Sequence, residues 1–378
     1  MATAPADPID AFSITLPEPI DLSHAPVPVN DSERLLFRQL FPTLIRIDCR
    51  GQVQPGLATQ WERDSTGQTW TFVIPENALF PDGTPLAPST ISADWHRRWP
   101  AIQKLGVASV NILDSQRLAA TLAAPSDSLP RIFADPAMAV VPVNQPDNLT
   151  GMIVSSRPAM PVVEVEVNRT GDLRDALDAG ADLVVSRDPS VIDYAAGRAE
   201  FETFPLPWDR TYVLIERPGV EPLPASVSSD SIRRSLTQGA VGADAREAEP
   251  PFWWHNPCAI EVSMHVRRPS TAQLGYPRTD PIARQLAERL IALAGDSLQL
   301  RAVGLEIEGF SAATTPGSER AYVFALPYRP LTPCAEATFW TRKGRLVPLI
   351  DSRAHAIVRR GSPPLTVDWD GIVRALPP

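Results

Sequence analysis

A short stretch near the N-terminus, TGQTWTFVIPENALFPDGTPL (residues 66–86), constrains the fold of this chain more than any other. Its first half alternates as a β-strand does, so Trp70, Phe72 and Ile74 fall on one face and less bulky residues on the other. The PDGTP sequence that follows has the composition of a rigid turn, in which Gly83 is free to take a positive φ. We find no metal-binding, nucleophilic or phosphate-binding motif in the stretch.

Strand-like and helix-like segments alternate along much of the chain, which is typical of an α/β protein. Residues 161–186 are predicted to form a strand, a helix and a strand, with Asp172 in the first helical turn, where the helix dipole favours an acid. A later helix is predicted over residues 280–295. Its apolar side chains recur at a helical spacing that predicts one buried face, formed by Ile282, Leu286, Leu290 and Leu293.

Two earlier helices are predicted from their capping residues. Asp31 or Ser32 is expected to cap a helix through ERLLFRQLF, and Ser89 or Thr90 one in APSTISADWHRRW.

The size and composition of the chain set limits on its class. At 378 residues and 41.2 kDa, the chain exceeds what one hydrophobic core usually supports, which predicts more than one lobe. Its 41 prolines are spread along the sequence and predict many rigid loops. The net charge of −9, without a basic stripe, argues against nucleic-acid binding. The three cysteines do not define a disulfide framework, and no apolar run is long enough to span a membrane.

Residues 40–95 resemble the N-terminal signature of the extracytoplasmic solute-binding proteins of family 5, the peptide- and nickel-binding components of ABC transporters. That signature contains Pro-Gly-Leu-Ala-x-x-Trp, then Gly-x-Thr-aromatic-Thr-Phe, then Phe-x-Asp-Gly-Thr-Pro-Leu. The matching residues here are Pro55, Gly56, Leu57, Ala58, Trp61, Gly67, Thr69, Trp70, Thr71, Phe72, Phe80, Asp82, Gly83, Thr84, Pro85 and Leu86.

The resemblance implies an α/β fold: a two-lobed clamp of the type II periplasmic-binding-protein kind, with mixed sheets and a small extra lobe. On this basis we predict a discontinuous lobe I (residues 1–43, 155–212 and 346–378), a small lobe II that carries the signature (44–154) and a reduced lobe III (213–345). The resemblance also implies a monomer that binds a small-molecule or peptide ligand and has an ABC permease as its partner. We expect no cofactor, no metal and no nucleic acid.

The chain departs from the family pattern in two respects. The region from Arg217 to Cys258 is short and rich in proline and serine, and Glu216 stands where the family has a polar amide. In addition, the first 19 residues lack the positively charged and apolar regions of a signal peptide. The protein is therefore expected to be extracytoplasmic if a signal has been removed, and cytoplasmic if Met1 is the native start.

The first candidate ligand site is the segment FPLPWDRTYV, where the resemblance places a crossing between lobes. Trp208, Asp209, Arg210 and Tyr212 are its candidate ligand-binding residues, because Asp and Arg side chains bind the termini of a peptide or the carboxylate of a small acid. The alternative is a surface loop in which Asp209 and Arg210 pair with each other.

Further aromatic residues provide a second set of candidates. Trp253 and Trp254 are neighbours, and in a strand they would face opposite sides, so one of them is a candidate for lining the cleft. Tyr328 and Trp340, with Phe339, are candidates from the third lobe. For both sets the alternative is ordinary packing at a lobe edge.

Local motifs for metal binding and catalysis are weak or missing. His255, Cys258 and His265 fit no standard metal-site spacing. We find no nucleophile elbow, zincin motif, Walker loop or dinucleotide fingerprint, although a catalytic site assembled from distant residues leaves no local motif. Two hypotheses follow: a solute-binding protein for an ABC transporter, or a cytoplasmic form of the same clamp that acts as a ligand sensor or a biosynthetic enzyme.

Overall fold

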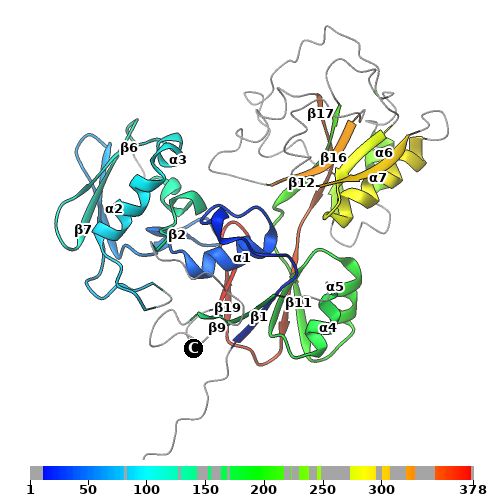
Figure 1. The fold of residues 1–378 in the computed structure, drawn as a ribbon, viewed down its shortest axis with the longest axis horizontal. Helices are drawn as coiled ribbons and strands as arrows, with labels where there is room; N and C mark the ends of the chain where they lie inside the picture. The colour runs from blue at the N-terminus through cyan, green and yellow to red at the C-terminus, as the bar shows by residue number, and fades with distance from the viewer. Residues whose placement is uncertain are drawn as a thin grey trace, which may run out of the picture. The chain divides into compact units, whose positions relative to one another are not determined.

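The structure is a computed structural model, and its described residues form two compact units (Figure 1). Unit 1 comprises Met1–Ser186, Val191–Leu206 and His355–Pro378, and unit 2 comprises Arg187–Ser190 and Pro207–Ala354. The three-lobe boundaries predicted from the sequence divide the chain more finely, and they stay a prediction. The described residues are 12–80, 83–126, 129–142, 152–154, 163–167, 171–216, 223, 230–237, 245–247, 273–294, 300–306, 321–327 and 345–375.

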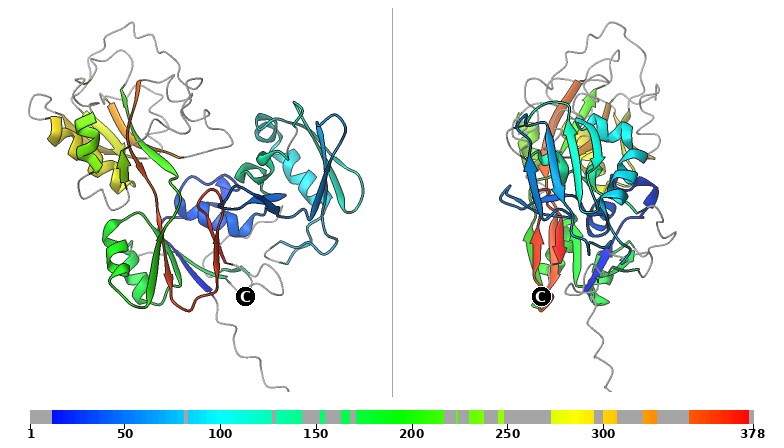
Figure 2. Two further views of the ribbon diagram at one scale, coloured as in Figure 1. Left: turned by 180° about the vertical axis from the view of Figure 1, so that it is seen from behind. Right: turned by 90° about the vertical axis from the view of Figure 1, so that its left-hand side faces the viewer.

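The larger sheet of unit 1 has six strands in the order β11-β18-β10-β1-β9-β8. Strand β1 lies parallel to both β9 and β10, as the predicted strand, helix and strand unit requires, whereas β18 is antiparallel to β10 and β11. The helices α4 and α5 lie on one face of this sheet (Figure 2), where Leu177 and Ala195 belong to the same buried cluster as Val184 and Ile357. The bounds are β1 Phe12–Leu16, β8 Met152–Val154, β9 Val163–Val167, α4 Leu173–Asp178, β10 Leu183–Ser186, α5 Pro189–Ala196, β11 Phe201–Pro205 and β18 His355–Arg359.

The smaller sheet of unit 1 is antiparallel, with the order β4-β5-β7-β6, and it contains the signature strand. Trp70, Phe72 and Ile74 are buried on one face, as predicted. The ring of Phe133 packs edge-on against Phe72 and stacks on Trp95 of α2. The bounds are β4 Gln60–Arg63, β5 Thr69–Val73, α2 Pro88–Arg97, α3 Trp99–Lys104, β6 Val107–Ile112, β7 Arg117–Leu122, η2 Arg131–Ala134 and η3 Pro136–Met138.

Two positions of the signature require glycine for different structural reasons. Gly56 lies against the backbone of residues 43–44, and a Cβ there would be only 2.4 Å from the Thr43 carbonyl oxygen. Gly83 has a φ of +82° and an N–H that donates to the Phe80 carbonyl at 2.9 Å, with open space around its missing side chain. The first glycine is therefore required by close approach and the second by backbone conformation.

The N- and C-terminal parts of unit 1 meet at helix α1. Arg38 of α1 forms an ion pair of 2.6 Å with Asp370, in the turn of the β19-β20 hairpin, and both side chains are nearly fully buried. The backbone N–H of Trp369, in the same turn, donates to the Ile47 carbonyl. The bounds are η1 Leu22–His24, α1 Asp31–Leu40, β2 Ile45–Ile47, β3 Val53–Pro55, β19 Leu365–Val367 and β20 Val373–Ala375.

Both predicted helix caps of this region are wrong by one or more residues. The N-cap of α1 is Asn30, whose side chain accepts the Glu33 N–H at 2.7 Å, instead of Asp31 or Ser32. The N-cap of α2 is Ala87, because Pro88 occupies the first helical position, where a missing N–H has no consequence. Thr90 still contributes, since its hydroxyl accepts the Ala87 N–H at 3.4 Å.

Unit 2 contains a mixed six-stranded sheet in the order β13-β17-β12-β16-β14-β15, with α6 and α7 packed against it (Figure 1). The predicted long helix is confirmed as α7, with Leu286 and Leu290 buried. Leu293 was expected on the same buried face but is 40% exposed, one residue before the helix ends. The bounds are β12 Arg210–Glu216, α6 Asp230–Thr237, β13 Ala245–Glu247, β14 Gln273–Pro277, α7 Pro281–Ala294, β15 Arg301–Leu305, β16 Ala321–Pro327 and β17 Arg345–Ser352.

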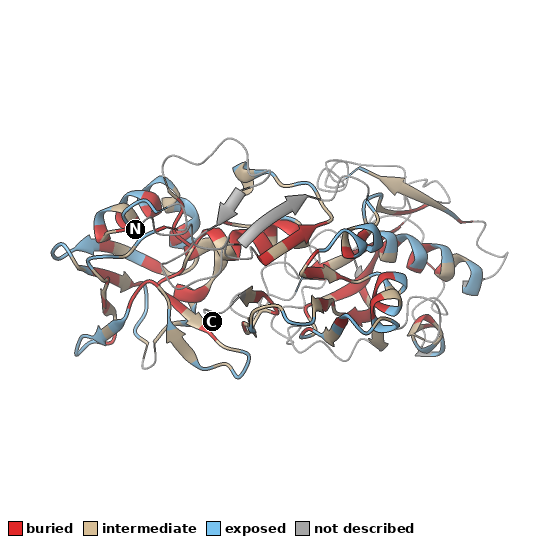
Figure 3. Cartoon of the chain, turned by 90° about the horizontal axis from the view of Figure 1, so that it is seen from below, coloured by how far each residue is buried: buried red, intermediate tan, exposed pale blue. Residues whose placement is uncertain are grey.

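Each unit has its own buried residues (Figure 3). Buried residues run along the central strands and the sheet-facing sides of the helices. Among the described residues, no helix is both long and apolar enough to cross a membrane.

Candidate functional site

The first candidate segment lies where the chain passes from unit 1 to unit 2. The chain leaves β11 of unit 1 at Pro205, enters unit 2 at Pro207 and begins β12 at Arg210. It returns through β17, which ends at Ser352. Because β12 pairs with β17 in antiparallel register, the start of one strand lies beside the end of the other, and Arg210 is opposite Ser352. Side chains from both passages therefore lie together in unit 2.

Trp208 is at the centre of these side chains, which we call the Trp208 cluster. The Trp208 side chain is partly exposed. Among the described residues, it does not belong to the hydrophobic core of unit 2. The guanidinium carbons of Arg246 and Arg353 lie 4.6 and 4.5 Å from its ring centroid, which is cation–π distance. The members of the cluster are Arg187, Trp208, Asp209, Arg210, Thr211, Arg246, Asp351 and Arg353.

Asp351 holds one of these arginines in place. Its carboxylate is 1% exposed; one oxygen accepts the Thr211 hydroxyl at 2.6 Å and the other accepts the Arg246 Nε–H at 3.1 Å. The three residues form one cross-strand row, because Asp351 is in register with both Thr211 of β12 and Arg246 of β13. A buried carboxylate with two such partners fixes the position of the guanidinium on Trp208.

Asp209 forms a second ion pair, with Arg187, the residue after β10, and its backbone contacts the end of β17. Its carboxylate lies 2.5 Å from Arg187 Nη2 and 3.9 Å from Arg210 Nε, and its backbone N–H donates to the Ser352 carbonyl at 3.5 Å. The Asp209 and Arg187 side chains are only 9% and 10% exposed. The alternative of a surface loop paired through Asp209 and Arg210 alone therefore does not describe this segment.

Tyr212 has a structural partner. Its side chain is buried, and its hydroxyl donates to the Asp280 carboxylate at 3.1 and 3.2 Å. Asp280 also accepts the N–H groups of Ile282 and Ala283 at the start of α7. Burial and the Asp280 charge hold the pKa of Tyr212 well above its usual range, although Arg210 and Arg187 act in the opposite direction. The hydroxyl therefore stays protonated and ties β12 to α7.

The remaining predicted residues lie outside the part of the chain that the structure describes. These are the ligand candidates Trp253, Trp254, Tyr328 and Trp340, the neighbouring Phe339, and the weak metal candidates His255, Cys258 and His265. Their roles stay predictions. Within the described ranges, we find no group of three or more His, Cys, Asp or Glu side chains placed to hold a metal ion.

Sequence reasoning missed Arg187, Arg246, Asp351 and Arg353. A signal was present for Arg187, since it directly follows a serine at the end of a predicted strand, in LVVSRD. Arg246 had no such signal, because the short strand β13 lies in a stretch whose composition predicts a polar loop.

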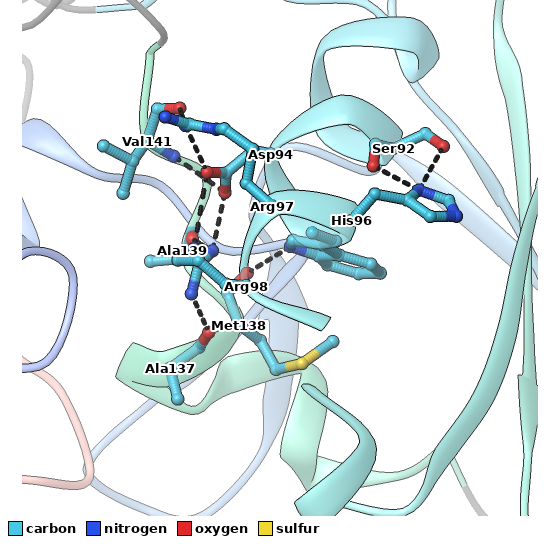
Figure 4. A network of polar contacts seen from close by, with 10 residues as sticks. Ser92, Asp94, His96, Arg97, Arg98, Ala137, Met138, Ala139 and Val141 are labelled. Atoms are coloured by element: carbon cyan, nitrogen blue, oxygen red, sulfur yellow. Dashed lines mark hydrogen bonds and ion pairs between the residues drawn. The ribbon is translucent and has the colours of Figure 1, made fainter. Parts of the chain in front are cut away.

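A second charged network lies in unit 1 and is structural (Figure 4). Asp94 of α2 is fully buried and forms ion pairs of 2.7 and 2.6 Å with Arg97 and Arg98. Arg98 also donates to the carbonyls of Ala137 and Ala139, and the Val141 N–H donates to Asp94. These partners all belong to the protein itself, so the network attaches residues 137–141 to α2.

The fold is that of the solute-binding proteins that serve ABC transporters, as solved structures show. NikA from Staphylococcus aureus, crystallised with Ni(L-His)2, matches with a TM-score of 0.69 and 12% identity over 95% of this chain and 97% of its own. The dipeptide binding protein from Pseudoalteromonas sp. SM9913, in complex with Met-Leu, has the same TM-score and identity over 96% of this chain and 98% of its own. The predicted type II clamp fold and the resemblance to family 5 are thereby confirmed, at the level of fold.

Two curated proteins match the sequence over shorter stretches. The periplasmic murein peptide-binding protein MppA of Escherichia coli K12 is 35% identical over 80 residues, and the periplasmic oligopeptide-binding protein OppA of Salmonella typhimurium LT2 is 38% identical over 65 residues. These stretches are 21% and 17% of this chain and span only 14% and 12% of the two relatives. No protein-family model matches the chain.

Proposed function

We propose that the chain is a solute-binding protein that takes up a small polar ligand, peptide-like or a metal chelate, for an ABC transporter. The observation that carries this proposal is the match over nearly the whole length of both chains to NikA with Ni(L-His)2 and to the dipeptide binding protein with Met-Leu. The short sequence matches to MppA and OppA support the same class of ligand. We further propose that the protein acts as a monomer and delivers its ligand to a permease.

The Trp208 cluster, which lies within unit 2, is the proposed ligand site. It combines a partly exposed aromatic surface with charged groups held by buried partners, which is the combination that small polar ligands require. A site of this kind positions its charged groups before the ligand arrives, so less of the binding free energy is lost in ordering them.

Titration calorimetry with three probes tests the proposal: the dipeptide Met-Leu, a murein tripeptide and Ni(L-His)2. We expect one of them to bind with a dissociation constant in the micromolar range or below and to raise the Tm, because a ligand that binds only the folded state stabilises it. Trp208→Ala should weaken that binding at least tenfold and leave the Tm of the unliganded protein near that of the wild type. Trp61→Ala, which removes a partly buried tryptophan of the smaller unit 1 sheet, is the matched control. Failure of all three probes to bind would contradict the proposed class of ligand.

A further inference from the structure

The connection between β1 and α1, residues 17–30, is attached to the first turn of α1 by polar contacts, and we call it the strap. Pro26 is its only buried residue, so the strap adds little to a hydrophobic core. One anchor is reciprocal: the Glu18 N–H donates to the Ser32 hydroxyl at 3.0 Å, and the Ser32 N–H donates to the Glu18 carboxylate at 2.8 Å. A segment with few buried apolar contacts opens locally more easily than the core beneath it.

Glu33, in the first turn of α1, binds three groups of the strap. Its side chain is 1% exposed. One carboxylate oxygen, Oε2, accepts the Val29 N–H at 2.9 Å, while Oε1 accepts the Asp21 N–H at 2.9 Å and lies 2.8 Å from His24 Nδ1. Among the residues that the structure describes, His24 is the only basic side chain within ion-pair distance of Glu33. Because a buried carboxylate is destabilising unless it is paired, the charge on His24 affects how firmly the strap is held.

Both ring nitrogens of His24 face carboxylates. Nδ1 is 2.8 Å from Glu33 Oε1, and Nε2 is 3.9 Å from Asp21 Oδ2. A neutral imidazole carries one N–H, so when Nδ1 donates to Glu33, Nε2 faces Asp21 as an acceptor. An imidazolium donates from both nitrogens, and a hydrogen bond between charged groups is about twice as strong as one between neutral groups. The stronger contribution comes from Glu33, since the Asp21 side chain is 60% exposed.

We propose that His24 is a proton-controlled latch: the strap is held firmly on α1 when the ring is charged and opens more readily when the ring is neutral. The side chain is 36% exposed, so it exchanges protons with solvent. Histidine is the side chain that changes its charge between about pH 5 and pH 8, which is the range in which such a latch works. The latch is independent of which solute the protein binds.

Hydrogen exchange followed by mass spectrometry on the full chain, at about pH 5.5 and about pH 8, tests the latch. Each measured rate is divided by the intrinsic rate at that pH, so the remaining change reports opening of the strap. We expect the protection of residues 18–30 to fall about fivefold from the lower to the higher pH, because a charged hydrogen bond becomes a neutral one. The protection of β5, in the smaller sheet of the same unit, should change by less than about twofold, because β5 belongs to a separate buried cluster.

His24→Gln removes the charge and retains an N–H donor. It should lower the protection of the strap at the lower pH and abolish its pH dependence. The matched control is His96→Gln on α2, because His96 Nδ1 lies 2.7 Å from the Ser92 carbonyl and the ring stacks on Trp99, without a carboxylate partner among the described residues. This control should keep the wild-type pH dependence. Glu33→Gln should abolish the pH dependence as well, and if that variant does not fold, the exposed position of His24 keeps the first comparison available.

The latch is overturned if the strap of the wild-type protein is equally protected at both pH values, or if the fall in protection survives in His24→Gln. A fall of equal size in β5, or its loss in His96→Gln, would show that the pH acts on unit 1 as a whole and would overturn the latch too. Solute binding is measured separately by the calorimetric titrations, so failure of the latch leaves the proposed function intact.

Discussion

Gly56 is the residue of the signature at which the structure makes its most quantitative prediction. In the substitution Gly56→Ala, the new Cβ would lie 2.4 Å from the Thr43 carbonyl oxygen and 2.9 Å from that of Leu44. Both contacts are to backbone atoms, and an ordinary carbon–oxygen contact is about 3.3 Å or longer. The segment would therefore have to move by nearly 1 Å.

That movement acts on two hydrogen bonds. The Leu57 N–H donates to the Thr43 carbonyl and the Ala58 N–H to the Leu44 carbonyl, each at 2.9 Å. A shift of nearly 1 Å takes both beyond hydrogen-bond distance, and each buried group left without a partner costs about 1–3 kcal/mol. Alanine also restricts the unfolded chain, which offsets about 0.4–1 kcal/mol. We therefore expect Gly56→Ala to destabilise this part of unit 1 by about 2–4 kcal/mol.

Gly83→Ala is the matched control, because it makes the same substitution where a Cβ meets nothing within 4 Å. Its cost is only that of a positive φ, about 1–2 kcal/mol. Hydrogen exchange followed by mass spectrometry on peptides that contain β5 measures the local free energy of opening without assuming that the whole chain unfolds in one step. The reasoning is refuted if Gly56→Ala protects β5 as well as wild type does, or if it costs no more than Gly83→Ala.

Three further predictions concern the buried charges and the tyrosine. Asp94→Asn should lower the free energy of unfolding by about 2–4 kcal/mol in urea titration, toward the lower end because Arg97 and Arg98 are partly exposed; an unchanged midpoint would contradict the structural role of the network. Burial raises the pKa of Asp370, but the guanidinium groups of Arg38 and its neighbours outweigh burial and hold that pKa below its usual value. The ion pair therefore stabilises the fold above about pH 4, and this stability is lost as the pH falls through the lowered pKa. Asp370→Asn should lower the free energy of unfolding at pH 7 and have less effect at pH 3. Equal effects at both pH values would contradict this. Tyr212→Phe should lower the free energy of unfolding by about 1–2 kcal/mol, because it removes the hydrogen bond to Asp280. It should also reduce the loss of stability above pH 10, because the raised pKa of Tyr212 is the source of part of that loss. A stability profile at alkaline pH identical to that of the wild type would exclude this.

Two features of the signature region were predictable from the sequence, because strand alternation and turn composition are local. Alternation placed Trp70, Phe72 and Ile74 on the buried face, and turn composition identified Gly83. The reason for Gly56 was not predictable, since it depends on the approach of a backbone segment 12 or 13 residues earlier in the chain. Helix caps were misplaced where asparagine or a proline at the first helical position competed with the predicted residue.

The candidate site was predictable only in part, for the same reason. Trp208, Asp209 and Arg210 were identified as a segment, because aromatic and charged side chains adjoin there. Their partners come from β13, from the end of β17 and from the residue after β10. Strand register brings Arg246 and Asp351 together, and an ion pair with Asp209 adds Arg187. No local pattern in the sequence encodes that register, so Asp351 and the arginines around it could be found only from the structure.

The most direct test of the solute-binding function is native mass spectrometry of the protein purified gently from its own host. The account predicts a folded protein that retains a stoichiometric small solute, a peptide or a metal chelate, which is released when the ring of Trp208 is removed in Trp208→Ala. A wild-type protein that retains no solute under these conditions, and that takes up none of Met-Leu, murein tripeptide or Ni(L-His)2 when they are added, would contradict it.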